Sequence, residues 1–186
     1  MYWSINTLAK IGLAVIFISA LNFSCQDSKE STEQKHANST YFDIPQFIQG
    51  EIDSLKKLNP QIEKTVFKDQ EEETKKLTIS DWDAEFASFK NIDLNKPAYA
   101  GQIEVDTIDQ IVEYHFLDPK SDLSCVRIKL DSLGNPNMIS IEKQIKNKLY
   151  QTSEFLVYEK GSFYLLEKNQ DVQVMGENYY KVQGNF

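Results

Sequence analysis

Residues 149–166, LYQTSEFLVYEKGSFYLL, hold two apolar runs separated by the turn-forming residues EKG. Apolar and aromatic side chains occupy every position at 155–158 and again at 163–166. Neighbouring residues of a strand point to opposite faces, so this segment predicts a hairpin that is apolar on both faces. One face belongs to the core of a sheet, and the other needs a helix, closure of the sheet, a ligand or a partner to cover it. We expect a helix over 45–58 to provide one of these covers.

The second half of the chain has the pattern of an antiparallel meander. The turn-forming segments DPKSD, DSLGNPN, EKG and MGEN separate short runs that alternate in polarity. The predicted strands are 102–107, 110–117, 125–130, 138–146, 149–158, 162–168 and 179–186, with 172–175 as an extension of the sixth.

The second and third of these strands also suggest a register. Pairing Phe116 with Val126 puts apolar residues on one face and charged residues on the other, as a half-exposed antiparallel sheet requires. This register places His115 opposite Arg127, with Cys125 one residue pair away from His115.

The first part of the predicted domain combines two helices with a hairpin. Apolar residues recur at spacings of three and four around 45–58, which predicts an amphipathic helix with Asp43 as its cap. The other elements predicted before residue 91 are strands at 61–68 and 75–80, which flank the acidic tip DQEEE, and a short helix over 81–90 with Trp82, Phe86 and Phe89 on one face. Together these elements predict an α+β fold: an N-terminal helix on a curved antiparallel meander of about seven to nine strands, with a partly open barrel as the alternative.

The first residues of the chain predict export. Residues 1–10 carry one lysine and no acid, and the apolar run IGLAVIFISAL follows at 11–21. This run is shorter than the roughly 20 apolar residues of a membrane span and has the layout of a secretory signal. The alternative is a buried N-terminal helix, which the polar tract after Cys25 disfavours.

The end of this run resembles the lipobox of bacterial lipoproteins. In Leu21-Asn22-Phe23-Ser24-Cys25 the Ser-Cys pair fits that motif, whereas Asn22 and Phe23 depart from it. The resemblance implies a lipoprotein signal peptide at 1–24, acylation of Cys25, and anchoring in the bacterial cell envelope. Gln26 rather than aspartate follows the cysteine, which implies the outer membrane by analogy with enterobacterial sorting. The alternative for Cys25 is a disulfide with Cys125, because export permits disulfides.

The order of helix, hairpin, short helix and meander also resembles uncharacterised envelope lipoproteins, which supply no activity. Residues 25–40 are then the lipidated cysteine and a polar tether, and residues 41–186 form a single α+β domain. Removing 1–25 takes away one lysine, so 19 of the 20 basic residues and all 28 acidic residues remain, a formal charge of −9. Such an acidic chain without a basic cluster argues against nucleic acid as a partner.

No sequence motif indicates a reaction. Nucleophile-elbow, zinc-protease, paired-cysteine, Walker A and dinucleotide-binding motifs do not occur. Cys125 and His115 fall on adjoining predicted strands, but no third residue is indicated that would orient such a pair. The acids of DWDAE at 81–85 lack the spacing of a calcium loop and suit the first turn of a helix. We therefore expect no catalytic residue, cofactor or metal.

The sequence favours a non-catalytic envelope protein with an interaction or structural role. The alternative is a carrier that holds a lipid or another apolar molecule against the sheet, where tyrosine hydroxyls would orient a polar head group. The candidate ligand-binding residues, predicted on one side of the last strands, are Tyr150, Leu156, Tyr158, Tyr164, Leu166 and Tyr180. The helix over 45–58 is the competing cover for the same side chains.

Overall fold

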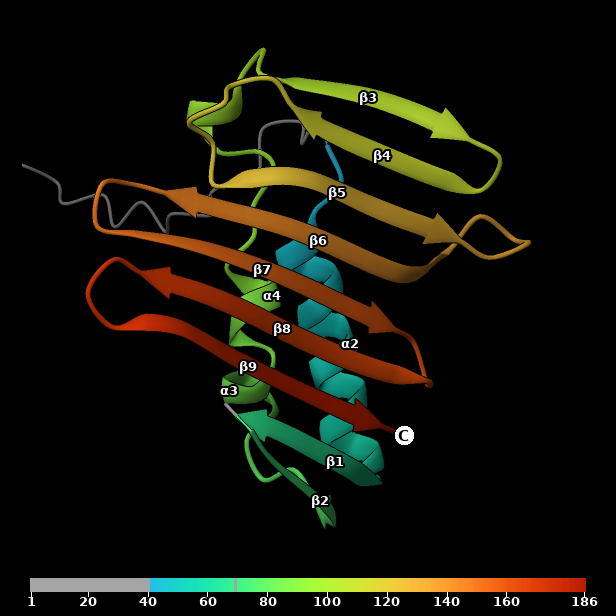
Figure 1. Ribbon diagram of the computed structural model, residues 1–186. Helices are drawn as coiled ribbons and strands as arrows, with labels where there is room; N and C mark the ends of the chain where they lie inside the picture. The colour runs from blue at the N-terminus through green and yellow to red at the C-terminus, as the bar shows by residue number, and fades with distance from the viewer. Residues whose placement is uncertain (1–40, 69) are drawn as a thin grey trace, which may run out of the picture. The chain divides into compact units, whose positions relative to one another are not determined.

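The computed structural model describes residues 41–68 and 70–186 (Figure 1). The predicted signal peptide, Cys25 and the predicted tether up to residue 40 lie outside the described residues. Within the part of the chain that is described, no helix has the length and apolar character needed to cross a membrane.

The described residues form one open antiparallel sheet of nine strands, in the spatial order β2-β1-β9-β8-β7-β6-β5-β4-β3. The strands are β1 (Gln61–Lys68), β2 (Glu71–Thr78), β3 (Ile103–Ile108), β4 (Ile111–Phe116), β5 (Leu123–Leu130), β6 (Pro136–Lys146), β7 (Tyr150–Glu159), β8 (Phe163–Val172) and β9 (Gly176–Asn185). Strands β3 to β9 are neighbours in sequence order, and β1 pairs with β9. The predicted α+β meander is confirmed, whereas the barrel alternative is wrong because β2 and β3 remain as two separate edges.

One face of the sheet is covered by helices (Figure 1). They are α2 (Ile44–Leu58), α3 (Trp82–Glu85) and α4 (Ala87–Lys90), and a short 3-10 helix, η1 (Pro97–Tyr99), precedes β3. The Asp43 carboxylate accepts the backbone N–H of Gln46 at 2.9 Å and so caps α2, as predicted. At its other end α2 stops at Asn59, whose left-handed φ of 44° turns the chain toward β1.

The hydrophobic core lies between these helices and the sheet. Trp82, Phe86 and Phe89 are all buried, which confirms the predicted apolar face of this segment. The ring of Phe86 lies 5.3 Å, centroid to centroid, from the rings of both Tyr158 on β7 and Tyr164 on β8. Aromatic contacts of this kind join the helix layer to the centre of the sheet.

Two local predictions at the first hairpin and the short helix were wrong. Glu71, Glu72 and Glu73 belong to β2 rather than to a turn, because an exposed edge strand accepts charged side chains on both faces. Such charges also discourage pairing of the edge with another chain. The predicted helix over 81–90 is divided at Phe86, whose φ of −98° and ψ of 10° end α3 before α4 begins.

The predicted register of β4 and β5 was wrong by two residues. Tyr114, not Phe116, lies opposite Val126, and His115 lies directly opposite Cys125. A slip of two residues leaves every side chain on its face, so the alternation of polarity could not detect it. The connection at 117–122, which contains a turn closed by the Ser121 N–H and the Asp118 carbonyl, sets the register instead.

Candidate functional site

The candidate ligand-binding residues share the helix-covered face of the sheet. Tyr158 pairs with Tyr164 and Leu156 with Leu166, while Tyr180 lies opposite Lys168 and Tyr150 opposite Val172. Leu156, Tyr158 and Tyr164 are buried in the core, and Leu166 packs against it partly buried. Tyr150 and Tyr180, at 36% and 38% exposure, lie beyond this buried group.

The two buried tyrosine hydroxyls donate hydrogen bonds to carboxylates on helices α2 and α3. The Tyr158 hydroxyl donates to Glu51 on α2 at 2.6 Å, and the Lys160 ammonium donates to the other oxygen of Glu51 at 2.8 Å. The Tyr164 hydroxyl donates to Glu85 on α3 at 2.5 Å. Burial and these hydrogen bonds to carboxylates raise the pKa of both tyrosines far above the ordinary value, so both hydroxyls remain protonated donors.

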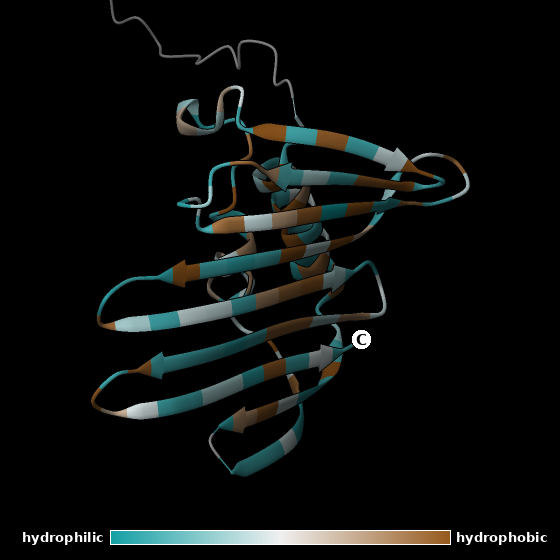
Figure 2. Cartoon of the chain, turned by 45° about the horizontal axis from the view of Figure 1, so that its top comes forward, coloured by the Kyte–Doolittle hydropathy of each residue, from teal (hydrophilic) through white to brown (hydrophobic). Residues whose placement is uncertain are grey.

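The opposite face of β7 and β8 carries a second apolar group. Because side chains alternate, Phe155 and Val157 on β7 and Phe163 and Leu165 on β8 point away from the helices. Val157 is only 7% exposed although no described helix lies over it, and the other three are partly buried by their neighbours. Figure 2 shows the hydrophobic stretches of these two strands side by side. We call these four residues the uncovered apolar strip.

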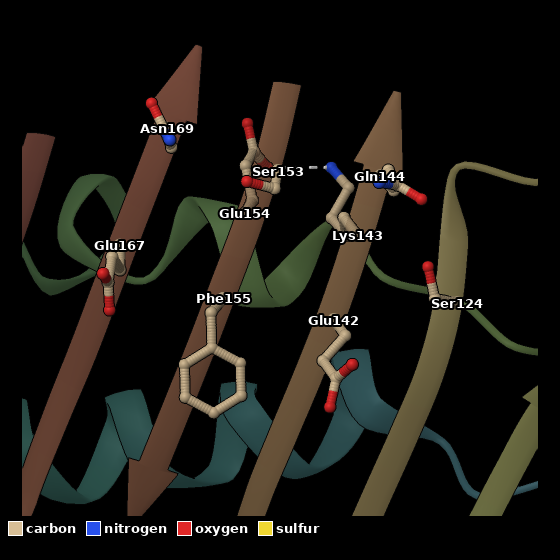
Figure 3. A pocket seen from close by; sticks show the side chains of 9 residues that line it. All are labelled: Ser124, Glu142, Lys143, Gln144, Ser153, Glu154, Phe155, Glu167 and Asn169. Atoms are coloured by element: carbon tan, nitrogen blue, oxygen red, sulfur yellow. Dashed lines mark ion pairs between the residues drawn. The ribbon is translucent and has the colours of Figure 1, made fainter. Parts of the chain in front are cut away.

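A hollow of about 440 Å³ lies beside this strip (Figure 3). Four neighbouring strands contribute its lining residues, which are Ser124, Glu142, Lys143, Gln144, Ser153, Glu154, Phe155, Glu167 and Asn169. Carboxylates, side-chain amides and hydroxyls therefore surround a single aromatic ring. This composition offers many hydrogen-bonding groups to a bound molecule.

No protein family, curated protein or solved structure matches the chain. Function is therefore inferred from the geometry of the described residues. The resemblance to envelope lipoproteins stays a prediction that rests on the residues around Cys25 and on the order of the predicted elements.

Sequence patterns identified the apolar strip but not the hollow. The consecutive apolar positions at 155–158 and 163–166 showed that both faces of the hairpin are apolar. Glu142, Phe155 and Glu167 become neighbours only through the pairing of β6 with β7 and of β7 with β8. Serine, glutamine and asparagine on exposed strand positions are too common for a sequence pattern to single them out.

Proposed function

We propose that this chain is a lipid-anchored, non-catalytic envelope protein that binds a partner protein through the uncovered face of its sheet. The observation that carries the proposal is the uncovered apolar strip. The helix layer covers Leu156 and Tyr158, with Tyr158 in contact with α2, whereas no element of the described residues forms a second layer over the outward-facing Phe155 and Val157.

The surroundings of the strip support a protein partner. Protein interfaces commonly have an apolar centre with aromatic side chains and a polar rim. Here the rim includes the cations Arg127 and Lys181 and the carboxylates Glu142 and Glu167, which lie on neighbouring strands of the same face. Strands that are paired on both sides also lose little backbone freedom on binding.

Anchoring is the second part of the proposal, and it predicts acylation of Cys25. In cells given a clickable fatty-acid analogue, we expect the wild-type protein to be labelled and the Cys25→Ser variant to lose essentially all label. More than one acyl chain on one cysteine would hold the protein stably at a bilayer, since each buried CH₂ contributes about 0.8 kcal/mol. Cys125→Ser is the matched control and should be labelled as fully as the wild type. Equal labelling of the wild type and Cys25→Ser would contradict the proposed acylation of Cys25.

Site-specific photo-crosslinking tests the binding surface. We expect a photoreactive phenylalanine analogue at position 155 or 165 to give one discrete crosslinked species in intact cells, because both side chains belong to the strip. The same analogue at Lys57, an exposed position on α2, is the control and should give no such species.

The mass of the crosslinked species separates the outcomes. A species of twice the monomer mass would identify a second copy of this chain as the partner, and a different mass would identify another protein. Absence of any species specific to positions 155 and 165 would overturn the proposed binding surface. The carrier alternative stays a prediction, and it would require a ligand to displace the helix layer from Leu156, Tyr158 and Tyr164.

A further inference from the structure

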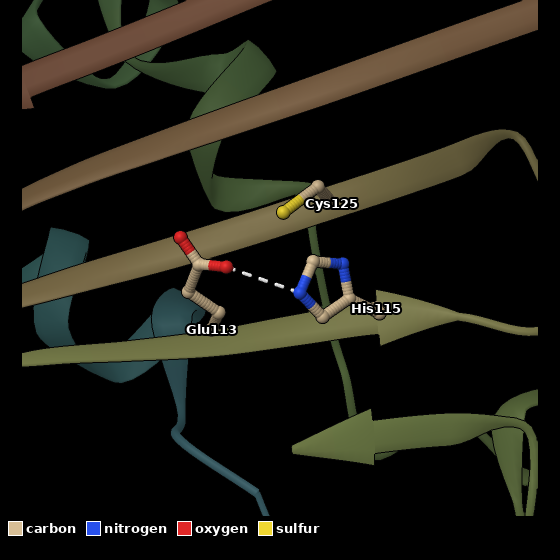
Figure 4. A group of neighbouring side chains, drawn as sticks. All are labelled: Glu113, His115 and Cys125. Carbon is tan, nitrogen blue, oxygen red and sulfur yellow. Dashed lines mark hydrogen bonds and ion pairs between the residues drawn. The ribbon is translucent and has the colours of Figure 1, made fainter. Parts of the chain in front are cut away.

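Three side chains with metal-binding groups meet on the uncovered face of β4 and β5 (Figure 4). His115 lies directly opposite Cys125 in the strand register, and Glu113 is the next residue of β4 on the same face. One ligand atom from each of the three lies within 4.8 Å of the others. The His115 Nε2 and a Glu113 carboxylate oxygen are 3.0 Å apart.

Arg127 fixes the orientation of Glu113. Its Nε donates to one carboxylate oxygen of Glu113 at 2.7 Å, which leaves the other oxygen directed toward His115. Its Nη1 donates to Glu142 at 2.5 Å. The hydrogen bond from Arg127 lowers the pKa of Glu113, and that from His115 adds to the effect. Outer hydrogen bonds of this kind commonly hold metal ligands in place.

We propose that Cys125, His115 and Glu113 bind one divalent transition-metal ion of the zinc class, with water as the fourth ligand. Zinc takes thiolate, imidazole and carboxylate ligands in tetrahedral sites, at about 2.0–2.3 Å from each ligand atom. These bond lengths place ligand atoms roughly 3.3–3.8 Å apart, so small side-chain rotations complete the site. Calcium and magnesium prefer all-oxygen sites, and a thiolate with an imidazole does not suit them.

The local charges favour such an ion. Glu113 and Glu142 with Arg127 leave one net negative charge at this place. Burial raises the pKa of the Cys125 thiol, an effect that Arg127 opposes. A thiol that binds the ion as a thiolate gives up its proton to solvent, and a divalent ion with one thiolate brings the group to neutrality. In the proposed site the imidazole would coordinate through Nε2, the nitrogen that faces Glu113, with its proton on Nδ1.

Cobalt(II) titration of the purified full-length protein tests the site. Cobalt(II) occupies zinc sites, and a thiolate ligand produces a near-ultraviolet charge-transfer absorption that nitrogen and oxygen ligands do not. We expect this absorption to saturate at one cobalt per chain and to disappear when zinc is added. Absence of a saturable cobalt or zinc signal would overturn the proposal and leave the three residues as part of an ion-pair network with Arg127.

Single substitutions assign the ligands. Cys125→Ser should remove the charge-transfer absorption, and His115→Ala should weaken zinc binding by roughly 100-fold or more, because loss of even an outer-shell partner costs 10–100-fold. Glu177→Gln on β9, four strands away from β5, is the matched control and should leave zinc affinity unchanged. Cys25→Ser and His36→Ala should also retain the absorption. A signal that survives Cys125→Ser, or that is lost in Cys25→Ser, would place the metal elsewhere and overturn the assignment.

Discussion

Replacing Gly184 with alanine should destabilise the protein by about 3 kcal/mol, near the upper end of the usual cost of overpacking a core. Gly184 lies on β9 directly opposite Tyr164 on β8, and the tyrosine ring occupies the space over its α-carbon. An added β-carbon would approach two ring carbons and the hydroxyl oxygen of Tyr164 closer than 3.0 Å. The ring cannot swing away freely, because it is buried against Phe86 and its hydroxyl is bonded to Glu85.

Gly50→Ala is the matched control. We expect it to raise the free energy of unfolding, whereas Gly184→Ala lowers it. Gly50 lies within α2, and a β-carbon there meets no atom within 4 Å. Alanine should therefore stabilise the protein by about 0.5–1 kcal/mol through its better helix propensity. Urea unfolding followed by circular dichroism measures both values. If Gly184→Ala costs as much in a Tyr164→Leu background as in the wild type, the proposed clash with the ring is wrong.

Phe86→Ala should destabilise the protein by about 3–5 kcal/mol, the largest effect that we expect from any single substitution. Phe86 is fully buried at the break between α3 and α4, and its ring contacts those of Trp82, Phe89, Tyr158 and Tyr164. Truncation leaves a cavity between the helix layer and the sheet, and the surrounding rings are too rigid to fill it.

An exposed apolar residue provides the control for Phe86. Leu133, in the turn between β5 and β6, is 84% exposed, and Leu133→Ala should change the free energy of unfolding by less than about 0.5 kcal/mol. Both variants can be compared by urea unfolding with circular dichroism. A cost below about 1.5 kcal/mol for Phe86→Ala would contradict the central role of this ring in the core.

The spacing of apolar residues and the capping residue were enough to predict the helices and strands and which side of each is buried. The spacing of Ile48, Ile52 and Leu55 identified the buried side of α2, and Asp43 identified its start. Alternation in β4 and β5 separated core residues such as Tyr114 from outward residues such as His115. These assignments succeeded because a side chain's face depends on its own position and on helix or strand periodicity alone.

The candidate metal site and the uncovered face of the sheet depend on how distant segments pair. The return of β1 to β9 and the position of His115 opposite Cys125 depend on contacts between segments and on loop geometry. A shift of two residues preserves every polarity pattern, so the sequence could not bring Glu113, His115 and Cys125 together. The sequence by itself determined that both faces of β7 and β8 are apolar. Only the tertiary structure decided which face is covered, because α2 has one apolar side and can cover only one face of the sheet.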